Sequence, residues 1–256
     1  MGICKGGAPI DNLEQWKDVA PPKNPEKQWV DERSAMELAR AWLEKAPAAM
    51  PPEVVAVLRS HPDFSAIRSW IAEPEALQRF DDFPGEPRNT DLAVKVDDEA
   101  GAYLLSVEGK ADEPFGETIE RTLDAARTRL AANPRSNGVR RITQLLEAIV
   151  GSPDCERYGN LRYQLLTATA GALCEAERKG CRRAVVLIHE FLTRKTDDQK
   201  HDSNAADLDR FVADLSGGHV NRVVPGQLFG PFFVPGYPLT STRIALYLAK
   251  VVRNIR

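Results

Sequence analysis

Residues 183–191 form the segment that most constrains the fold of this chain. The uninterrupted apolar run Ala184–Ile188 within it is too short to span a membrane. A run that is apolar at consecutive positions is typical of a strand in the middle of a sheet that helices cover on both faces. Helical and strand-like stretches occur both before and after this segment, so the sequence predicts an α/β fold around a mixed sheet.

The composition is that of a globular protein. Of the 256 residues, 43% are hydrophobic and 28% are charged, which excludes a wholly disordered chain, a collagen-like repeat and a coiled-coil rod. No N-terminal segment has the layout of a secretory signal, so we expect a cytoplasmic protein that makes no membrane contact. The formal net charge of −3 argues against a nucleic-acid partner, unless the charge is unevenly distributed.

The signatures of several enzyme classes are absent from the sequence. The four cysteines lack the two-residue spacing of a zinc knuckle, which indicates buried thiols in a reducing compartment. The four histidines are scattered, and there is no Walker loop, Gly-x-Ser-x-Gly elbow or Gly-x-Gly-x-x-Gly motif. Serine hydrolases with that elbow, P-loop NTPases and dinucleotide enzymes are therefore excluded as first hypotheses.

The chain is expected to contain two regions. Residues 1–84 are predicted to form an irregular arm, over about the first 30 residues, and a helical subdomain. Residues 85–256 are predicted to form the α/β domain. The elements expected in the first region are helices at 34–45, from Pro51-Pro52 to Leu58 and at 66–71. Those expected in the second are hairpin strands at 91–96 and 102–107, helices from Gly116 to Leu130 and at 139–150, 163–179 and 205–215, the strand at 183–191 and a polar loop at 193–204.

The predicted hairpin brings two carboxylates together. A turn with Glu99 and Ala100 at its centre places Asp91 opposite Glu108, where paired Cβ atoms are about 4.5–5.5 Å apart. Because strand side chains alternate, Glu108 and Lys110 point to the same face. Two carboxylates this close need a neutralising partner, and a hard divalent cation such as Mg²⁺ or Mn²⁺ suits them. With Lys110 beside the metal, the hairpin end predicts a centre that can orient water or a phosphate.

An ordinary solvated hairpin end is the simpler interpretation of the same residues. An acidic residue two positions before a lysine also occurs at 177–179 and at 198–200. The first copy lies in a predicted helix and the second in a predicted polar loop, so neither presents both side chains from one strand face. The carboxylate partner Asp91 and the strand context favour the metal centre at Glu108.

One pattern runs from Asp91 through sixteen further residues to Glu108-Gly109-Lys110 at the end of a strand, and a long helix follows it. This pattern resembles the PD-(D/E)XK nuclease superfamily. The resemblance covers roughly residues 85–195 and implies a restriction endonuclease-like fold. It also implies that Asp91 and Glu108 bind a divalent metal, that the Gly109 carbonyl can join them, and that Lys110 assists the attack of water on a phosphodiester. The proline of the family name corresponds to Pro87, which lies four residues before Asp91 rather than next to it.

Accessory polar residues follow from the same resemblance. Members often carry an acidic residue on the first core helix, for which Glu37 and Glu75 are the two candidates. Many also carry a polar residue on a later helix, and Gln164 occupies such a place. His189 and Glu190 end the central strand, at the sheet edge where α/β proteins bind ligands, so they are candidates to approach the same site.

Arginine-rich segments flank the acidic hairpin. Residues 121–141 hold six arginines against a single acid, and a second basic cluster lies at 178–183. Metal and arginines together can share the charge of a nucleic-acid phosphate, whereas ion pairs along one helix face explain the same clusters without a ligand. The arginines selected as contacts to nucleic acid are Arg135, Arg140, Arg141, Arg182 and Arg183.

These features predict a metal-dependent nuclease that hydrolyses phosphodiester bonds in DNA, with RNA as an open alternative substrate. A second hypothesis is a non-catalytic module on the same fold that binds nucleic acid or protein. A third is an unrelated metal enzyme with a carboxylate hairpin. Many nucleases of the superfamily pair to cut two strands, so the resemblance also implies a homodimer.

Overall fold

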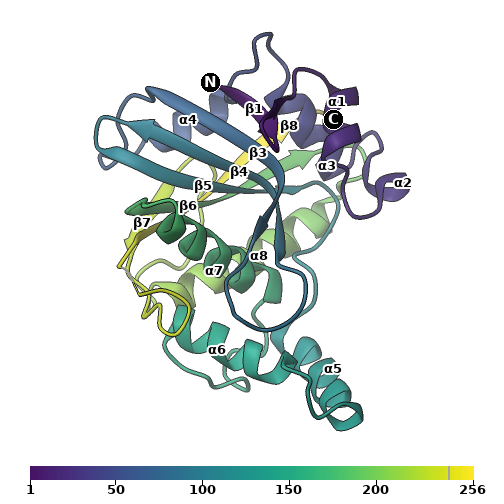
Figure 1. Ribbon diagram of the computed structural model, residues 1–256, viewed down its shortest axis with the longest axis vertical. Coiled ribbons are helices and arrows are strands. Elements are labelled where there is room, and N and C mark those ends of the chain that lie inside the picture. Colours follow the sequence, from purple (N-terminus) through teal and green to yellow (C-terminus); the bar gives the residue numbers. More distant parts are fainter. Residues whose placement is uncertain (242) are drawn as a thin grey trace.

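A mixed sheet of eight strands forms the centre of the molecule. The computed structural model describes residues 1–241 and 243–256. The strands are β1 (Gly2–Lys5), β2 (Ala8–Pro9), β3 (Ser69–Gln78), β4 (Arg88–Asp98), β5 (Gly101–Lys110), β6 (Arg183–Leu192), β7 (Leu228–Phe232) and β8 (Ala245–Asn254). Within the described residues their order is β2-β1-β3-β4-β5-β6-β8-β7, with helices on both faces (Figure 1). The predicted α/β class with a mixed sheet is confirmed.

Strand β6 lies in the interior of the sheet, as its continuous apolar run predicted. All of its residues except Leu192 are buried. It pairs in parallel with β5 on one side and with β8 on the other. Parallel neighbours require long crossover connections, and here both connections, residues 111–182 and 193–244, carry helices.

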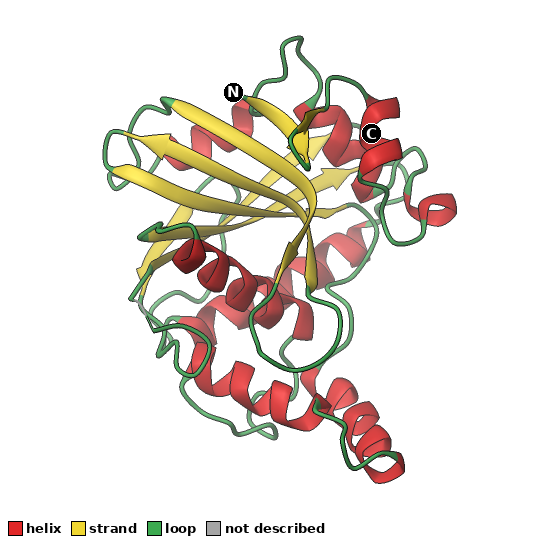
Figure 2. Ribbon diagram, in the orientation of Figure 1, coloured by secondary structure: helices red, strands yellow, loops and turns green. Residues whose placement is uncertain are grey.

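Helices lie on both faces of the sheet (Figure 2). They are α1 (Leu13–Val19), α2 (Pro25–Gln28), α3 (Ser34–Trp42), α4 (Pro52–Arg59), α5 (Ile119–Ala132), α6 (Gly138–Val150), α7 (Tyr163–Arg178) and α8 (Asp198–Leu215). α3 packs against β5 and β6, and α4 packs against β8, whereas α7 packs against β3, β4, β5 and β6. Two apolar cores result, one around Trp42 and Tyr103 and the other around Leu104 and Leu146. No helix in the described residues is long and apolar enough to cross a membrane.

The β4–β5 hairpin has the predicted register. Asp98 pairs with Gly101, which leaves Glu99 and Ala100 as the two turn residues. The Asp98 carboxylate accepts a hydrogen bond from the Ala100 backbone N–H at 2.8 Å and so closes the turn. Gly101 has φ +111°, a conformation that side chains disfavour, which explains a glycine at this position.

The predicted helix at residues 66–71 is wrong, because strand β3 begins at Ser69. Ser69, Trp70 and Ile71 pair with β4, and Ile71 also pairs with β1, so contacts between strands decide the conformation here. Residues 1–84 therefore add strands to the central sheet and are not purely helical.

Two further segments differ from the sequence predictions. The first 30 residues are not an irregular arm, because they contain β1, β2, α1 and α2. α8 begins at Asp198, inside the predicted polar loop 193–204. The cause is Asp197, whose side chain accepts a hydrogen bond from the Lys200 backbone N–H at 2.7 Å and caps the helix.

Candidate functional site

A buried polar cluster lies where β4 begins and β5 ends. The two strands are antiparallel, so Thr90 near the start of β4 lies beside Glu108 and Lys110 near the end of β5. Thr90, Glu108 and Lys110 are 0%, 1% and 6% exposed. Polar groups buried to this degree destabilise the fold unless they find hydrogen-bond partners, so the partners of each group define the site.

Three side chains donate hydrogen bonds to the Glu108 carboxylate. Thr90 Oγ1 lies 2.8 Å from Glu108 Oε1, and Gln164 Nε2 lies 2.9 Å from Oε2. Arg88 donates its Nη2 to Oε1 in a salt bridge whose side chains are 7% and 2% exposed. Glu108 is therefore held inside the protein with Arg88 as its bound cation.

Gln164, in the first turn of α7, links Glu108 to Lys110. Its Nε2 donates to Glu108, while its Oε1 accepts a hydrogen bond from Lys110 Nζ at 3.1 Å. Both strand residues thus face α7, as alternation along β5 predicted. Lys110 Nζ also lies 5.2 Å from the centre of the Phe115 ring, within cation–π range. The structure therefore brings the predicted accessory residue Gln164 into the cluster.

Asp91 lies beside the cluster, but its contact differs from the expected one. The regular pairing of β4 with β5 ends at Leu92. Beyond that residue Thr90 contacts the Glu108 side chain, whereas Asp91 Oδ2 accepts a hydrogen bond from the backbone N–H of Gly109 at 2.8 Å. Burial, followed by the negative charge of Glu108, raises the pKa of Asp91. The two carboxylates are therefore close enough to repel each other, although they do not share a hydrogen-bond donor.

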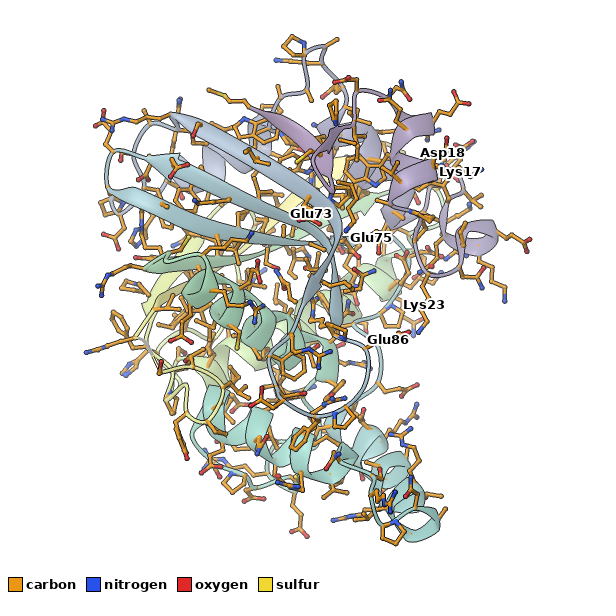
Figure 3. All side chains as sticks on the ribbon, in the orientation of Figure 1. Lys17, Asp18, Lys23, Glu73, Glu75 and Glu86 are labelled. Carbon is orange, nitrogen blue, oxygen red and sulfur yellow. The ribbon has the colours of Figure 1, made fainter. Side chains whose placement is uncertain are left out.

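Glu75 is the candidate acidic residue that lies near this cluster. It belongs to β3 rather than to a helix, and Figure 3 shows it where β3 curves. Its φ of +47° is rare for a residue other than glycine. Burial, followed by the charge of Asp91, raises the pKa of Glu75 to about 8, and the charge of Glu108 acts in the same direction. Glu37, the other candidate, instead accepts a hydrogen bond from Arg40 at 2.7 Å on α3.

His189 and Glu190 lie on β6 beside the end of β5, but they bind elsewhere. His189 Nε2 is 3.0 Å from Glu53 Oε1, on α4. Glu190 forms an ion pair with Lys250 at 2.7 Å, and its Oε2 lies 3.0 Å from His201 Nδ1. These contacts join both residues to α4, α8 and β8, although Glu190 is the strand partner of Lys110 across β5 and β6.

Arg182 and Arg183 lie far from the cluster. They stand at the start of β6, at the end of the sheet opposite Lys110, and the strand between spans about 25 Å. Arg183 is buried, and its guanidinium donates to both carboxylate oxygens of Asp98. The prediction that Arg183 contacts nucleic acid is therefore wrong, because its donors are used inside the fold.

Three cavities lead from the cluster along the β3–β4 loop. The first, of about 430 Å³, is lined in part by Arg88 and Gln164. The second, of about 220 Å³, includes Arg88 and Arg141 in its lining, and the third, of about 380 Å³, includes Arg140. The first two share Arg88, and the second and third share residues 79–81. Neighbouring cavities thus share lining residues, and two of the predicted arginines, Arg140 and Arg141, line them.

The exposure of the remaining arginines differs. Arg135 and Arg140 are exposed, so their guanidinium groups are open to a ligand. Arg141 is half-buried and binds Asp81 through Nε at 2.6 Å. Of the five arginines selected from the sequence, Arg135, Arg140 and Arg182 keep the exposure that a phosphate contact requires, but Arg182 stands at the far end of the sheet from the cluster.

The donor chemistry of the cluster suits a hard divalent cation. Glu75, Asp91 and Glu108 offer carboxylate oxygens, the ligands that Mg²⁺ and Mn²⁺ prefer. Burial, followed by repulsion between carboxylates, raises the pKa values of Glu75 and Asp91, so a bound cation would stabilise their charged forms. Within the described residues, however, no three His, Cys, Asp or Glu side chains are grouped so that they hold a metal ion. The oxygen ligands are therefore of the type that a hard divalent cation prefers, while the Glu108 carboxylate is bound to Arg88.

Arg88 is the member of the cluster that the sequence analysis missed. Its partner Glu108 lies twenty residues further along the chain and on another strand. An arginine near the start of a strand carries no local sign of such a partner. The predicted strand 91–96 would have to be extended by three residues to reach Arg88, and the strand 102–107 by one residue to reach Glu108.

Comparison with known proteins identifies the family of the chain. A search of the curated proteins and a search of the solved structures each found no match. The family model described as "Domain of unknown function (DUF6946)" matches residues 9–254, from the end of β2 to the end of β8. The match includes the whole polar cluster and the helices on both faces of the sheet. The chain therefore belongs to the DUF6946 family.

Proposed function

We propose that this protein is a metal-dependent nuclease that hydrolyses phosphodiester bonds in DNA, on a restriction endonuclease-like fold. The observation that carries the proposal is the hydrogen-bonded group Glu108–Gln164–Lys110 beside Asp91. A pair of carboxylates with an adjacent ammonium supplies the groups that such hydrolysis needs: metal ligands and a donor for water or phosphate.

The order of elements around the cluster supports the same proposal. α3 comes first, the antiparallel strands β3, β4 and β5 follow, and α7 leads to β6, which is parallel to β5. α8 comes next. With α4, α5 and α6 set aside as additional helices, this order of helix, three strands, helix, strand and helix is the one that the resemblance to the PD-(D/E)XK superfamily implies.

Each residue of the cluster has a chemical role in this proposal. Asp91 and Glu108 hold the divalent metal, with Glu75 and the Gly109 carbonyl as further oxygen donors. When bound, Mg²⁺ or Mn²⁺ supplies positive charge that stabilises the negative charge developing on the phosphoryl group. Lys110 donates a hydrogen bond to the attacking water or to a phosphate oxygen. Gln164 fixes the position of the Lys110 ammonium relative to Glu108.

The arginines near the cavities favour a polyanionic substrate. Arg140 lines the third cavity and is exposed, and Arg135 is exposed between α5 and α6. Contacts from such side chains to phosphates position a nucleic acid without reading its sequence. A substrate that passes along the β3–β4 loop would meet these arginines and the cluster in turn.

A non-catalytic module on the same fold is the second candidate. The observation in its favour is that Glu108 already has three donors, one of them a cation. A protein of this kind would bind nucleic acid through its arginines and would not cut it.

Cleavage assays separate the two candidates. Supercoiled plasmid and oligonucleotides of DNA and RNA are incubated with the protein and Mg²⁺ or Mn²⁺. Asp91→Ala and Lys110→Ala are expected to lower the cleavage rate by about 10²–10³-fold, because each removes a group that stabilises the transition state. Lys95→Ala is the matched control, since Lys95 is an exposed lysine on the same hairpin, and it is expected to keep the full rate.

The assay has two contrary outcomes. Cleavage that survives both Asp91→Ala and Lys110→Ala would place the chemistry elsewhere or in a contaminant. Binding of DNA without cleavage by the wild type would favour the non-catalytic module.

A further inference from the structure

Arg88 is the buried cation for which the proposed mechanism has no role. Its side chain is 7% exposed and donates Nη2 to Glu108. The other two donors to Glu108, Thr90 and Gln164, are neutral. Lys110 donates to Gln164 and so does not replace Arg88 on the carboxylate. Arg88 therefore supplies the positive charge in direct contact with Glu108.

The Arg88 guanidinium is only partly satisfied in this position. Its Nη1 is buried and has no hydrogen-bond partner among the described residues. The same holds for Nε2 of Gln78, which is the residue paired with Arg88 across β3 and β4. A buried donor without an acceptor costs free energy, so this arrangement stabilises the fold less than a fully bonded pair.

Space for a second position of the guanidinium lies next to it. Arg88 lines both the cavity of about 220 Å³ and the cavity of about 430 Å³. Glu86 and Thr167 line the smaller cavity and offer acceptors there. The backbone of Arg88 is held by its pairing with Gln78, so only the side-chain torsions need to change for the guanidinium to leave Glu108.

We propose that Arg88 is an internal counter-ion of Glu108 and that a divalent metal displaces it from the carboxylate. The inference rests on the proposed metal site and describes how that site is regulated. Metal binding and the Arg88–Glu108 salt bridge exclude each other, because both need the same carboxylate. In the metal-free protein, Arg88 thereby neutralises the buried Glu108 carboxylate. The salt bridge must break before the metal binds, so it lowers the affinity for metal.

Calorimetric titration with MnCl₂, in the absence of nucleic acid, tests this exchange. Arg88→Met removes the competing cation and is expected to tighten Mn²⁺ binding by about tenfold or more. Arg141→Met is the matched control, because Arg141 lines the same cavity but pairs with Asp81. Its Mn²⁺ affinity is expected to equal that of the wild type. Arg88→Gln keeps a donor without the charge and is expected to follow Arg88→Met, so it carries the test if the methionine variant does not fold.

The outcomes distinguish the exchange from the metal site itself. Wild-type Mn²⁺ binding that Glu108→Gln abolishes, with no tightening in either Arg88 variant, would overturn the exchange and leave the metal site intact. Mn²⁺ binding in none of these proteins would overturn the metal site and with it the proposed function. Binding by the Arg88 variants alone would be the strongest form of the expected result.

Discussion

The β4–β5 hairpin buries an arginine–carboxylate pair at each of its two ends, and the two pairs are built differently. At the turn, Arg183 donates to both oxygens of Asp98, at 2.7 and 3.0 Å, and to the Gly101 carbonyl at 2.7 Å. At the other end Arg88 donates to one oxygen of Glu108, and its Nη1 has no partner among the described residues. The first pair is a closed network, while the second leaves a donor unused.

The pKa shifts of the carboxyl groups also differ between the two ends of the hairpin. Although burial opposes it, the hydrogen bonds from Arg183 lower the pKa of Asp98 below its usual range. Near Glu108, burial and mutual repulsion raise the pKa values of Asp91 and Glu75. The turn end therefore stabilises the fold, whereas the other end holds unfavourable charge, as functional sites commonly do.

The largest effect is expected from Arg183→Met. It leaves the Asp98 carboxylate buried without its cation, so the free energy of unfolding should fall by about 3–5 kcal/mol. Urea denaturation followed by circular dichroism measures the change. The cleavage rate per folded molecule should stay close to that of the wild type, because Arg183 lies at the far end of the sheet. A loss of stability below about 1 kcal/mol would show that the Arg183–Asp98 pair contributes little to the stability of the fold.

Asp91→Asn should have the opposite effect on stability. The raised pKa of Asp91 means that its charged form is disfavoured in the fold, and asparagine can still accept the hydrogen bond from Gly109. The metal-free variant is therefore expected to be more stable than the wild type by about 1 kcal/mol at alkaline pH while it loses Mn²⁺ binding. Thermal denaturation with and without MnCl₂ gives both quantities. A variant less stable than the wild type would mean that the Asp91 charge supports the fold.

The third effect is a difference in the pH dependence of stability. The pKa of Glu75 rises from 4.5 to about 8 on folding, so its contribution is full below about pH 4.5 and is lost as the pH rises toward 8. The pKa of Asp98 falls below 3.8, so its contribution is present above that pH and is lost in more acidic solution. Urea titrations of metal-free protein from about pH 3 to pH 9 should show Glu75→Gln flattening the alkaline decline and Asp98→Asn the acidic one. If the free energies of unfolding of Glu75→Gln and the wild type coincide above pH 5, the charge of Glu75 is not coupled to those of Asp91 and Glu108.

Local patterns in the sequence were sufficient to predict that Glu108 and Lys110 lie together. Asp98 and Gly101 define the turn, the turn defines the register, and alternation along β5 then puts Glu108 and Lys110 on one face. Gln164 was selected through the resemblance to the superfamily, which implies a polar residue on a later helix, and it lies in the first turn of α7. These features depend on residues that are close in the chain or on one regular element.

The remaining features depend on contacts between distant segments. Glu75 could not be placed, since its strand has a helix-favouring composition and is formed only by pairing with β1 and β4. Arg183 was assigned to nucleic acid because a count of charges does not reveal that Asp98 takes up its guanidinium. Arg88 was missed for the same reason, as its partner Glu108 lies on another strand.

Diffraction from crystals soaked in MnCl₂, recorded at the manganese absorption edge, tests most directly whether the end of the hairpin at Asp91 and Glu108 is a metal site. We expect an anomalous peak bound by the carboxylates of Asp91 and Glu108, with the Arg88 guanidinium moved into the neighbouring cavity. Well-ordered crystals with no peak at these residues, and with Arg88 still bound to Glu108, would contradict both the metal site and the nuclease assignment that depends on it.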